Sequence, residues 1–186
     1  MGIMIEDGKG SGRSVEVDKD NHLVTNSITQ SVEHYTNHDL GLSFGLLFSA
    51  TPTGAGDCFL YIKNQSGVYD ICVEGFSLWL AADEYIDVKL GDTGTPVGGT
   101  TITPINLNTG SGTVVSGTFQ NGNDITGLSS GVTVNRIYHA SSQASVYTNF
   151  EQDLILKPNG VLTMYCQTGT TVLHGTLDLN VHDGVM

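Results

Sequence analysis

The sequence contains few basic residues. Seven lysines and arginines stand against nineteen aspartates and glutamates, which gives a formal net charge of −12. Proteins bind nucleic acids through clusters of cations that displace counterions from the phosphates. We therefore expect no nucleic-acid partner. Only 14% of the residues are charged, against about a quarter in an average domain, so Ser, Thr, Asn and Gly must form much of the surface. Such a surface is common where a protein contacts neighbouring subunits or lies outside the cell.

Long apolar segments are also missing. No run approaches the roughly 18 apolar residues that a membrane-spanning helix needs, and the first residues, MGIMIEDGKGSGR, lack the apolar centre of a signal peptide. We expect no membrane partner and synthesis in a cytoplasm. The three cysteines, Cys58, Cys72 and Cys166, are odd in number and not in C-x-x-C spacing. We interpret them as small buried apolar residues in a reducing compartment rather than as disulfide partners.

What the sequence does contain is a β-strand pattern, clearest over residues 149–182. Turn residues at Lys157–Gly160 and at Thr168–Thr170 divide this segment into three predicted strands. In the last strand Leu173, Gly175, Leu177, Leu179 and Val181 share one face, opposite His174, Thr176, Asp178, Asn180 and His182. This period of two residues is typical of a strand with one face on a core and one in solvent.

The same pattern continues upstream, from residue 42 onward. Ten or more short strands are predicted, and the apolar segment Ile71–Leu80, which carries Trp79, is expected to be central. Weaker strands are predicted over 101–107 and 113–119, and a strand over 144–150 is expected to precede the closing three. Glycine-rich loops are predicted over 91–99 and 121–131. Short strands at even spacing predict an all-β protein, with a jelly-roll-like antiparallel β-sandwich over residues 41–186.

Residues 1–40 differ from this domain. Their two short candidate strands, residues 13–18 and 22–28, carry too few large apolar side chains to form a core. We predict an extended N-terminal arm that gains order by strand addition to another surface, with Arg13, Val15 and Val17 as its partner contacts. The alternative is a disordered tail followed by an edge hairpin.

Candidate catalytic residues are present without their usual context. Gly127–Gly131 matches G-x-S-x-G around Ser129, but the residues that follow favour a strand and not the helix that a nucleophile elbow requires. Gly8–Gly12 is glycine-rich but lacks the spacing of a phosphate-binding loop. A glycosidase would need facing carboxylates, for which the candidates by residue type are Asp70, Glu74, Asp83, Glu84, Asp87, Glu151 and Asp153. We predict that the protein is not an enzyme.

Metal sites are predicted to be absent as well. His34 and His38 could share a zinc ion on a helix, but Tyr35–Asn37 disfavours a helix, and in a strand the pair would lie about 13 Å apart. The segments 18–21 and 121–124 carry oxygen ligands without the regular spacing of a calcium loop. Asx-turn chemistry explains them more simply. We predict no cofactor.

Five aromatic residues lie on predicted strands: Trp79, Tyr85, Tyr138, Tyr147 and Phe150. We expect them to pack in the core, which is the commoner use of aromatic residues on strands. A platform that stacks against sugars is the alternative interpretation.

Two segments carry a family resemblance. The first is GKGSGRSVEVDKDNHLVTNSITQS, a glycine-rich lead followed by R-x-V-x-V-D, a D-x-x-N-x-L turn and a second short strand; the second is LKPNGVLTMYCQTGT near the end. Both are similar to segments of small virion proteins of tailed bacteriophages, namely head decoration, cement and auxiliary proteins. The resemblance extends loosely along the whole chain, and its motifs are structural.

This resemblance implies a jelly-roll-like sandwich, usually trimeric or otherwise clustered, seated on the outside of a capsid with an arm across neighbouring major capsid protein subunits. The function would be mechanical stabilisation of the shell in the virion, after synthesis in the host bacterial cytoplasm. One alternative is a tail or head-fibre protein that binds a host receptor or glycan. Another is a polysaccharide-degrading enzyme or esterase, whose activity would depend on Ser129 or on a carboxylate.

Overall fold

The structure of the protein is a computed structural model, which describes residues 35–141 and 143–183. The predicted arm contacts Arg13, Val15 and Val17 lie outside the described residues, as do His34 and the segments 8–12 and 18–21. The predictions made for them therefore remain predictions.

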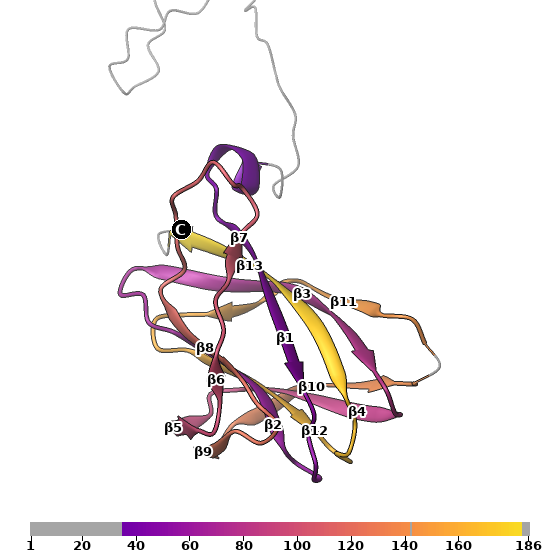
Figure 1. The fold of residues 1–186 in the computed structure, drawn as a ribbon. Helices are drawn as coiled ribbons and strands as arrows, with labels where there is room; N and C mark the ends of the chain where they lie inside the picture. Colours follow the sequence, from indigo (N-terminus) through magenta and orange to yellow (C-terminus); the bar gives the residue numbers. More distant parts are fainter. Residues whose placement is uncertain (1–34, 142, 184–186) are drawn as a thin grey trace, which may run out of the picture. The chain divides into compact units, whose positions relative to one another are not determined.

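Most strands of the described chain form two antiparallel β-sheets that pack face to face, which confirms the predicted all-β sandwich (Figure 1). The first sheet contains, in spatial order, β11 (Val146–Leu156), β3 (Tyr69–Leu80), β13 (Leu173–Asp183), β1 (Ser43–Ala50) and β7 (Ile105–Asn106). The second contains β10 (Val132–His139), β4 (Glu84–Leu90), β12 (Val161–Cys166), β2 (Cys58–Asn64), β8 (Gly117–Asn121) and β6 (Thr100–Thr101). Strand β3 lies between β11 and β13, which confirms its predicted central place.

Successive strands alternate between the two sheets. β1 and β3 belong to the first sheet and β2 and β4 to the second; from β10 to β13 the chain alternates again. The three predicted closing strands all exist, but β12 lies in the sheet opposite to β11 and β13. The predicted turn at Lys157–Gly160 is confirmed, because Asn159 has φ 67° and the Gly160 amide donates to the Lys157 carbonyl at 2.7 Å. It connects the two layers. The separate strand predicted over 144–150 is wrong, since β11 continues through an irregularity between Asn149 and Leu154.

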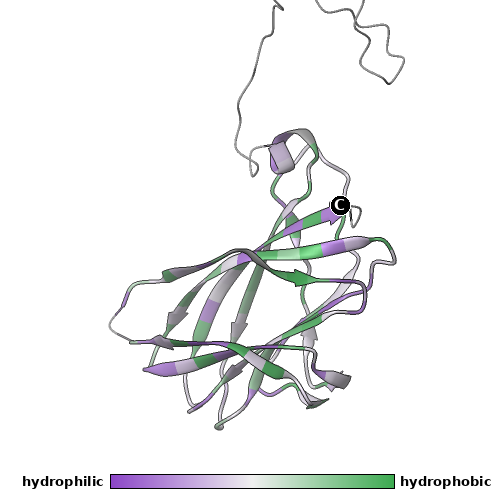
Figure 2. Cartoon of the chain, turned by 180° about the vertical axis from the view of Figure 1, so that it is seen from behind, coloured by the Kyte–Doolittle hydropathy of each residue, from purple (hydrophilic) through white to green (hydrophobic). Residues whose placement is uncertain are grey.

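The core fills the space between the sheets. Apolar and polar residues are mixed along the strands, as Figure 2 shows, and Leu173, Leu177, Leu179 and Val181 of the predicted apolar face of β13 are buried. The Phe48 ring occupies the space beside Gly175, where any Cβ would overlap it, and lies 6.0 Å from the Phe59 ring of the opposite sheet. The prediction that Asn180 lies on the solvent face of β13 is wrong, because Asn180 is buried and its amide donates to Glu74 Oε1 at 2.6 Å.

Both predicted glycine-rich loops contain strands. β5 (Thr93–Val97) pairs with β9 (Thr126–Ser129) in a two-stranded ribbon. Gly94 and Gly127 have φ values of 107° and 78°, and a Cβ on Gly94 would collide with the Gly127 carbonyl. The glycines thus permit close pairing here, although they predicted loops. Beside this ribbon lies a second apolar cluster on the outer side of the second sheet, formed by Cys58, Tyr61, Ile125 and Val161.

The two weaker predicted strands also need correction. Residues 101–107 do not form one strand, because β6 pairs with β8 in the second sheet and β7 pairs with β1 in the first. The segment therefore crosses between the sheets at one side of the sandwich. The strand predicted over 113–119 is shifted, since β8 begins at Gly117.

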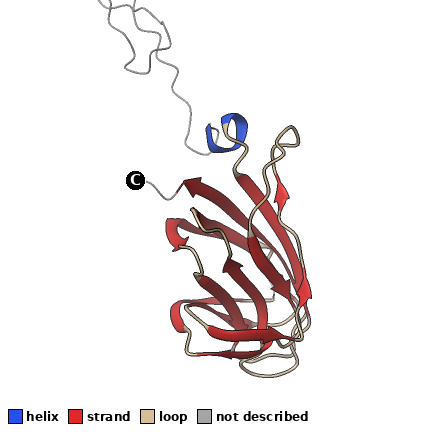
Figure 3. Ribbon diagram, turned by 90° about the vertical axis from the view of Figure 1, so that its left-hand side faces the viewer, coloured by secondary structure: helices blue, strands red, loops and turns tan. Residues whose placement is uncertain are grey.

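Residues 35–39 form one π-helical turn, η1 (Tyr35–Asp39), so the prediction that this segment is not helical is wrong (Figure 3). Asn108 Nδ2 donates to the Asn37 and His38 carbonyls at 2.9 and 3.2 Å, and these bonds hold the turn on the loop after β7. No helix within the described part of the chain has the length and apolarity needed to cross a membrane.

Candidate binding groove on the outer sheet face

The outer face of the first sheet carries two rows of side chains from β1, β13 and β3. In one row Ser49 pairs with His174, which pairs with Trp79; in the next, Leu47 pairs with Thr176, which pairs with Ser77. Because neighbours in a strand point to opposite faces, these residues point away from the core that their chain neighbours fill. The two rows form the floor of an open groove.

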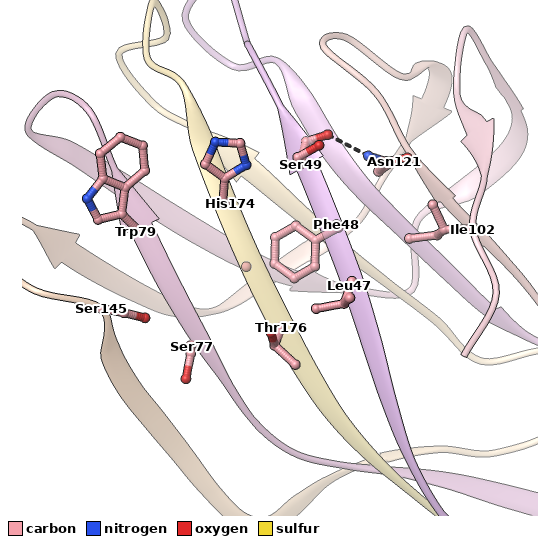
Figure 4. A pocket seen from close by; sticks show the side chains of 11 residues that line it. Leu47, Phe48, Ser49, Ser77, Trp79, Ile102, Asn121, Ser145, His174 and Thr176 are labelled. Atoms are coloured by element: carbon pink, nitrogen blue, oxygen red, sulfur yellow. Dashed lines mark hydrogen bonds between the residues drawn. The ribbon is translucent and has the colours of Figure 1, made fainter. Parts of the chain in front are cut away.

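The groove has a volume of about 520 Å³ (Figure 4). Ile102 and Asn121 line it beside β1, and Ser145 lines it beside β3. The Asn121 amide donates to the Ser49 carbonyl, and Asn123 Oδ1 accepts the Thr51 amide at 2.7 Å. The asparagines of the suggested calcium segment 121–124 therefore fasten the end of β1 through long-range hydrogen bonds, not through the local Asx turns that were predicted. Nowhere in the described residues do three or more His, Cys, Asp or Glu side chains gather to hold a metal ion.

Trp79 and His174 form the aromatic part of the groove. Their ring centroids are 5.6 Å apart and their planes differ by 18°. Figure 4 shows the two rings side by side on the same side of the sheet, above β3 and β13. Trp79 is 41% exposed and Leu47 is 64% exposed. A tryptophan costs free energy when its ring remains in water, so its position at the surface needs an explanation.

The prediction that the strand aromatics pack in the core is wrong for four of the five. Trp79, Tyr85, Tyr138 and Tyr147 are between 41% and 51% exposed, and Phe150 alone of these five is buried. For Trp79 the reason is strand parity. Phe76, Leu78 and Leu80 fill the inward positions of β3, so Trp79 points outward. This parity is visible in the sequence and was the one signal that could have located the groove.

Tyr147 extends the aromatic surface beside the groove. Its ring covers Gly75, where a Cβ would approach the Tyr147 ring carbon Cζ to 2.8 Å. Burial, together with the neighbouring Asp178 carboxylate, raises the pKa of Tyr147 to about 12. The phenol therefore stays protonated at neutral pH and can donate a hydrogen bond to Asp178.

Glu84, one of the candidate glycosidase carboxylates, accepts hydrogen bonds that hold a turn in place. Glu84 is 1% exposed and its two oxygens accept four hydrogen bonds, from the Tyr85, Thr168 and Gly169 amides and the Thr168 hydroxyl. These bonds fix the predicted turn between β12 and β13, where Gly169 has φ 75°.

Asp83 and Asp87, two further candidates, are likewise paired. Asp83 accepts hydrogen bonds from Tyr138 and Ser141, which lower its pKa. A two-point pair with Arg136 lowers the pKa of Asp87.

Asp70 and Glu74 belong to β3 in the first sheet, whereas Asp83, Glu84 and Asp87 lie on or beside β4 in the second. Asp70 pairs with Lys157 at 2.6 Å. The side chains of 151 and 153 lie outside the described residues. The described candidates are therefore divided between the two sheets.

Ser129 lies at the end of β9 and is exposed, and β10 begins three residues later. The local order is strand, turn, strand, which differs from the strand, turn, helix order of a nucleophile elbow.

Burial raises the pKa of the Cys58 thiol to about 12 and that of Cys72 to about 11, and it raises that of Cys166 as well. All three thiols are free and buried, which confirms the prediction that they act as small apolar residues.

Comparison of the chain with protein-family models, with curated proteins and with solved structures found no match.

Proposed function

We propose that this chain is a decoration or cement protein of a tailed bacteriophage, which binds the outside of the assembled capsid without catalysis. The sequence resemblance suggests the family, and the strand order supports it. The strands lie in the order β1-β13-β3-β11 in one sheet and β2-β12-β4-β10 in the other, and the chain passes from one sheet to the other between successive strands of this set. We propose that this arrangement is a jelly roll, a fold that occurs in viral capsid proteins and in lectins.

The observation that carries the proposal is an apolar edge of the first sheet. Ile105 on β7 and Leu107 just after β7 are each more than half exposed. Exposed apolar residues that lie together suit contacts between proteins, and a low-charge surface suits wide lateral contacts. A homo-oligomer, with a trimer favoured by the resemblance, would bury this edge between its subunits.

The partner would be the major capsid protein, reached by the N-terminal arm. A protein that binds the assembled shell and not its separate subunits stabilises the shell by mass action. Strand addition by residues near Arg13, Val15 and Val17 would supply backbone hydrogen bonds to capsid subunits.

Co-sedimentation with capsids tests the arm. Deletion of residues 1–30 should leave a folded sandwich that no longer sediments with capsids, and Val15→Asp with Val17→Asp should do the same in the full chain. Val97→Asp is the matched control, because Val97 is a 59% exposed valine of the β5–β9 ribbon. Undiminished binding by the deletion variant would refute the arm's role.

A second candidate function is recognition of a host surface by a tail or head-fibre protein. The exposed aromatic residues and the groove favour it, because a receptor-binding module needs such a surface. In this case the label of an antibody against the chain would lie on the tail or on fibres.

A further inference from the structure

The groove contains stacking and hydrogen-bonding groups but no strong charge. Its lining includes the Trp79 indole, the His174 imidazole and the hydroxyls of Ser49, Ser77 and Thr176. Among the residues that the structure describes, no carboxylate, lysine or arginine lines it. This neutrality contrasts with the net charge of −12 of the chain. Without a lysine or arginine the groove offers anions little Coulomb attraction, and the net negative charge of the chain repels them, so an uncharged ligand fits best.

The middle of the groove floor offers no free strand edge. Its floor consists of β1, β13 and β3; β13 and β3 are each hydrogen-bonded to strands on both sides, whereas β1 pairs with β7 only at Phe44 and Gly45. An extended peptide adds to a free strand edge, where main-chain groups are available. Over β13 and β3 only side chains project toward the ligand, so recognition there depends on ring stacking and on bonds to hydroxyls.

We infer that the groove of Trp79, His174, Ser49, Ser77 and Thr176 binds a segment of a neutral oligosaccharide. A pyranose ring presents a face of C–H groups that packs on the Trp79 and His174 rings, while its hydroxyls bond to the serines and the threonine. A volume of about 520 Å³ lies in the usual range for small-ligand sites. The open shape suits part of a longer glycan. For the surface-recognition function proposed above, this site defines the class of ligand. A capsid decoration protein can carry the same site.

Intrinsic fluorescence tests the inference directly, because Trp79 is the only tryptophan in the chain. The full chain is titrated with neutral hexasaccharides of β-1,4-glucose, α-1,4-glucose, mannose and galactose, and with an oligogalacturonate as an anionic comparison. We expect at least one neutral sugar to shift the Trp79 emission and to protect it from acrylamide quenching. The oligogalacturonate should change neither signal.

Calorimetry with the sugar that binds then locates the site. Trp79→Ala should weaken binding by about tenfold or more, as truncation of a buried aromatic contact does. Tyr85→Ala is the matched control, since Tyr85 is 48% exposed on the other sheet, and it should bind as the parent does. Both variants should retain the parent's circular dichroism spectrum and capsid binding.

Three results would overturn the inference. The first is that none of the four neutral sugars changes the Trp79 signal. The second is that Tyr85→Ala weakens binding as much as Trp79→Ala. The third is that Trp79→Ala abolishes capsid binding, which would make the groove a protein interface. Loss of capsid binding on deletion of residues 1–30, with sugar binding retained, would leave both proposals standing as separate functions.

Discussion

Replacement of Glu84 tests whether this carboxylate clamps a turn or performs chemistry. Its side chain is buried at the start of β4 and accepts four hydrogen bonds of 2.7–2.8 Å, three of them from Thr168 and Gly169 in the β12–β13 turn. Two of the donors in the turn are backbone amides. Without the carboxylate they would remain in a buried site with no acceptor.

The magnitude follows from these contacts. Glu84→Gln keeps one oxygen acceptor. Its NH2 group, however, faces a backbone amide that donates to the carboxylate in the parent protein. We expect a loss of about 2 kcal/mol in the free energy of unfolding, the value of one or two charge-assisted hydrogen bonds. Glu84→Ala removes all four acceptor contacts and should cost about 3–5 kcal/mol, because stranded buried donors cost roughly 1–3 kcal/mol each and water restores some of them. This is a large share of the roughly 5–15 kcal/mol of a typical domain.

Equilibrium unfolding in urea, followed by circular dichroism, measures both variants. Asp124→Asn is the control, because Asp124 is an exposed carboxylate near β9, and it should change stability by less than about 0.5 kcal/mol. If Glu84→Ala unfolds at the same urea concentration as this control, the clamp interpretation is wrong. A Glu84→Gln protein of full stability that had lost a hydrolytic activity of the parent would assign the residue to catalysis.

Three further predictions concern packing, pH and thiol reactivity. Gly175→Ala should lower stability by about 1–3 kcal/mol, because a Cβ there overlaps Phe48, whereas Gly67→Ala meets open space and should be neutral in the same thermal melt. Burial lowers the pKa of His139 below its ordinary 6.5. As the pH falls, the imidazole is therefore protonated in the unfolded chain before it is protonated in the folded protein. Its contribution to stability should be complete above pH 6.5 and decrease as the pH falls below it; a His139→Gln protein with the same pH slope would refute this. With the Cys58 thiol at a pKa of about 12, the native protein should resist a thiol reagent at pH 8, while the urea-unfolded chain reacts at all three cysteines; rapid native labelling would contradict the buried state.

The sequence predicts local features well because they depend on neighbouring residues. The alternation in 173–182 predicted which face of β13 is buried, and Lys157–Gly160 predicted a turn from proline, asparagine and glycine. Strand partners could not be predicted in this way. A two-residue period gives the face of each strand but not the sheet to which it belongs, so the alternation of β11, β12 and β13 between layers was not foreseen. Glycines predicted loops where Gly94 and Gly127 instead let β5 and β9 approach closely.

The groove illustrates the same limit. Its floor brings together Leu47, Trp79 and His174 from three strands that are distant in the sequence, and their register follows from the completed sheet. The sequence did show that Trp79 has the opposite parity to Phe76 and Leu78. It could not show that the strand on either side would leave the indole uncovered.

Immunogold electron microscopy of virions, purified from a lysate in which this chain is produced, tests the proposed decoration role most directly. An antibody against the chain is applied to intact particles, with virions that lack the chain as the control. The account predicts even labelling over the head, at many copies per particle. Label confined to the tail or its fibres, or particles without label, would contradict it.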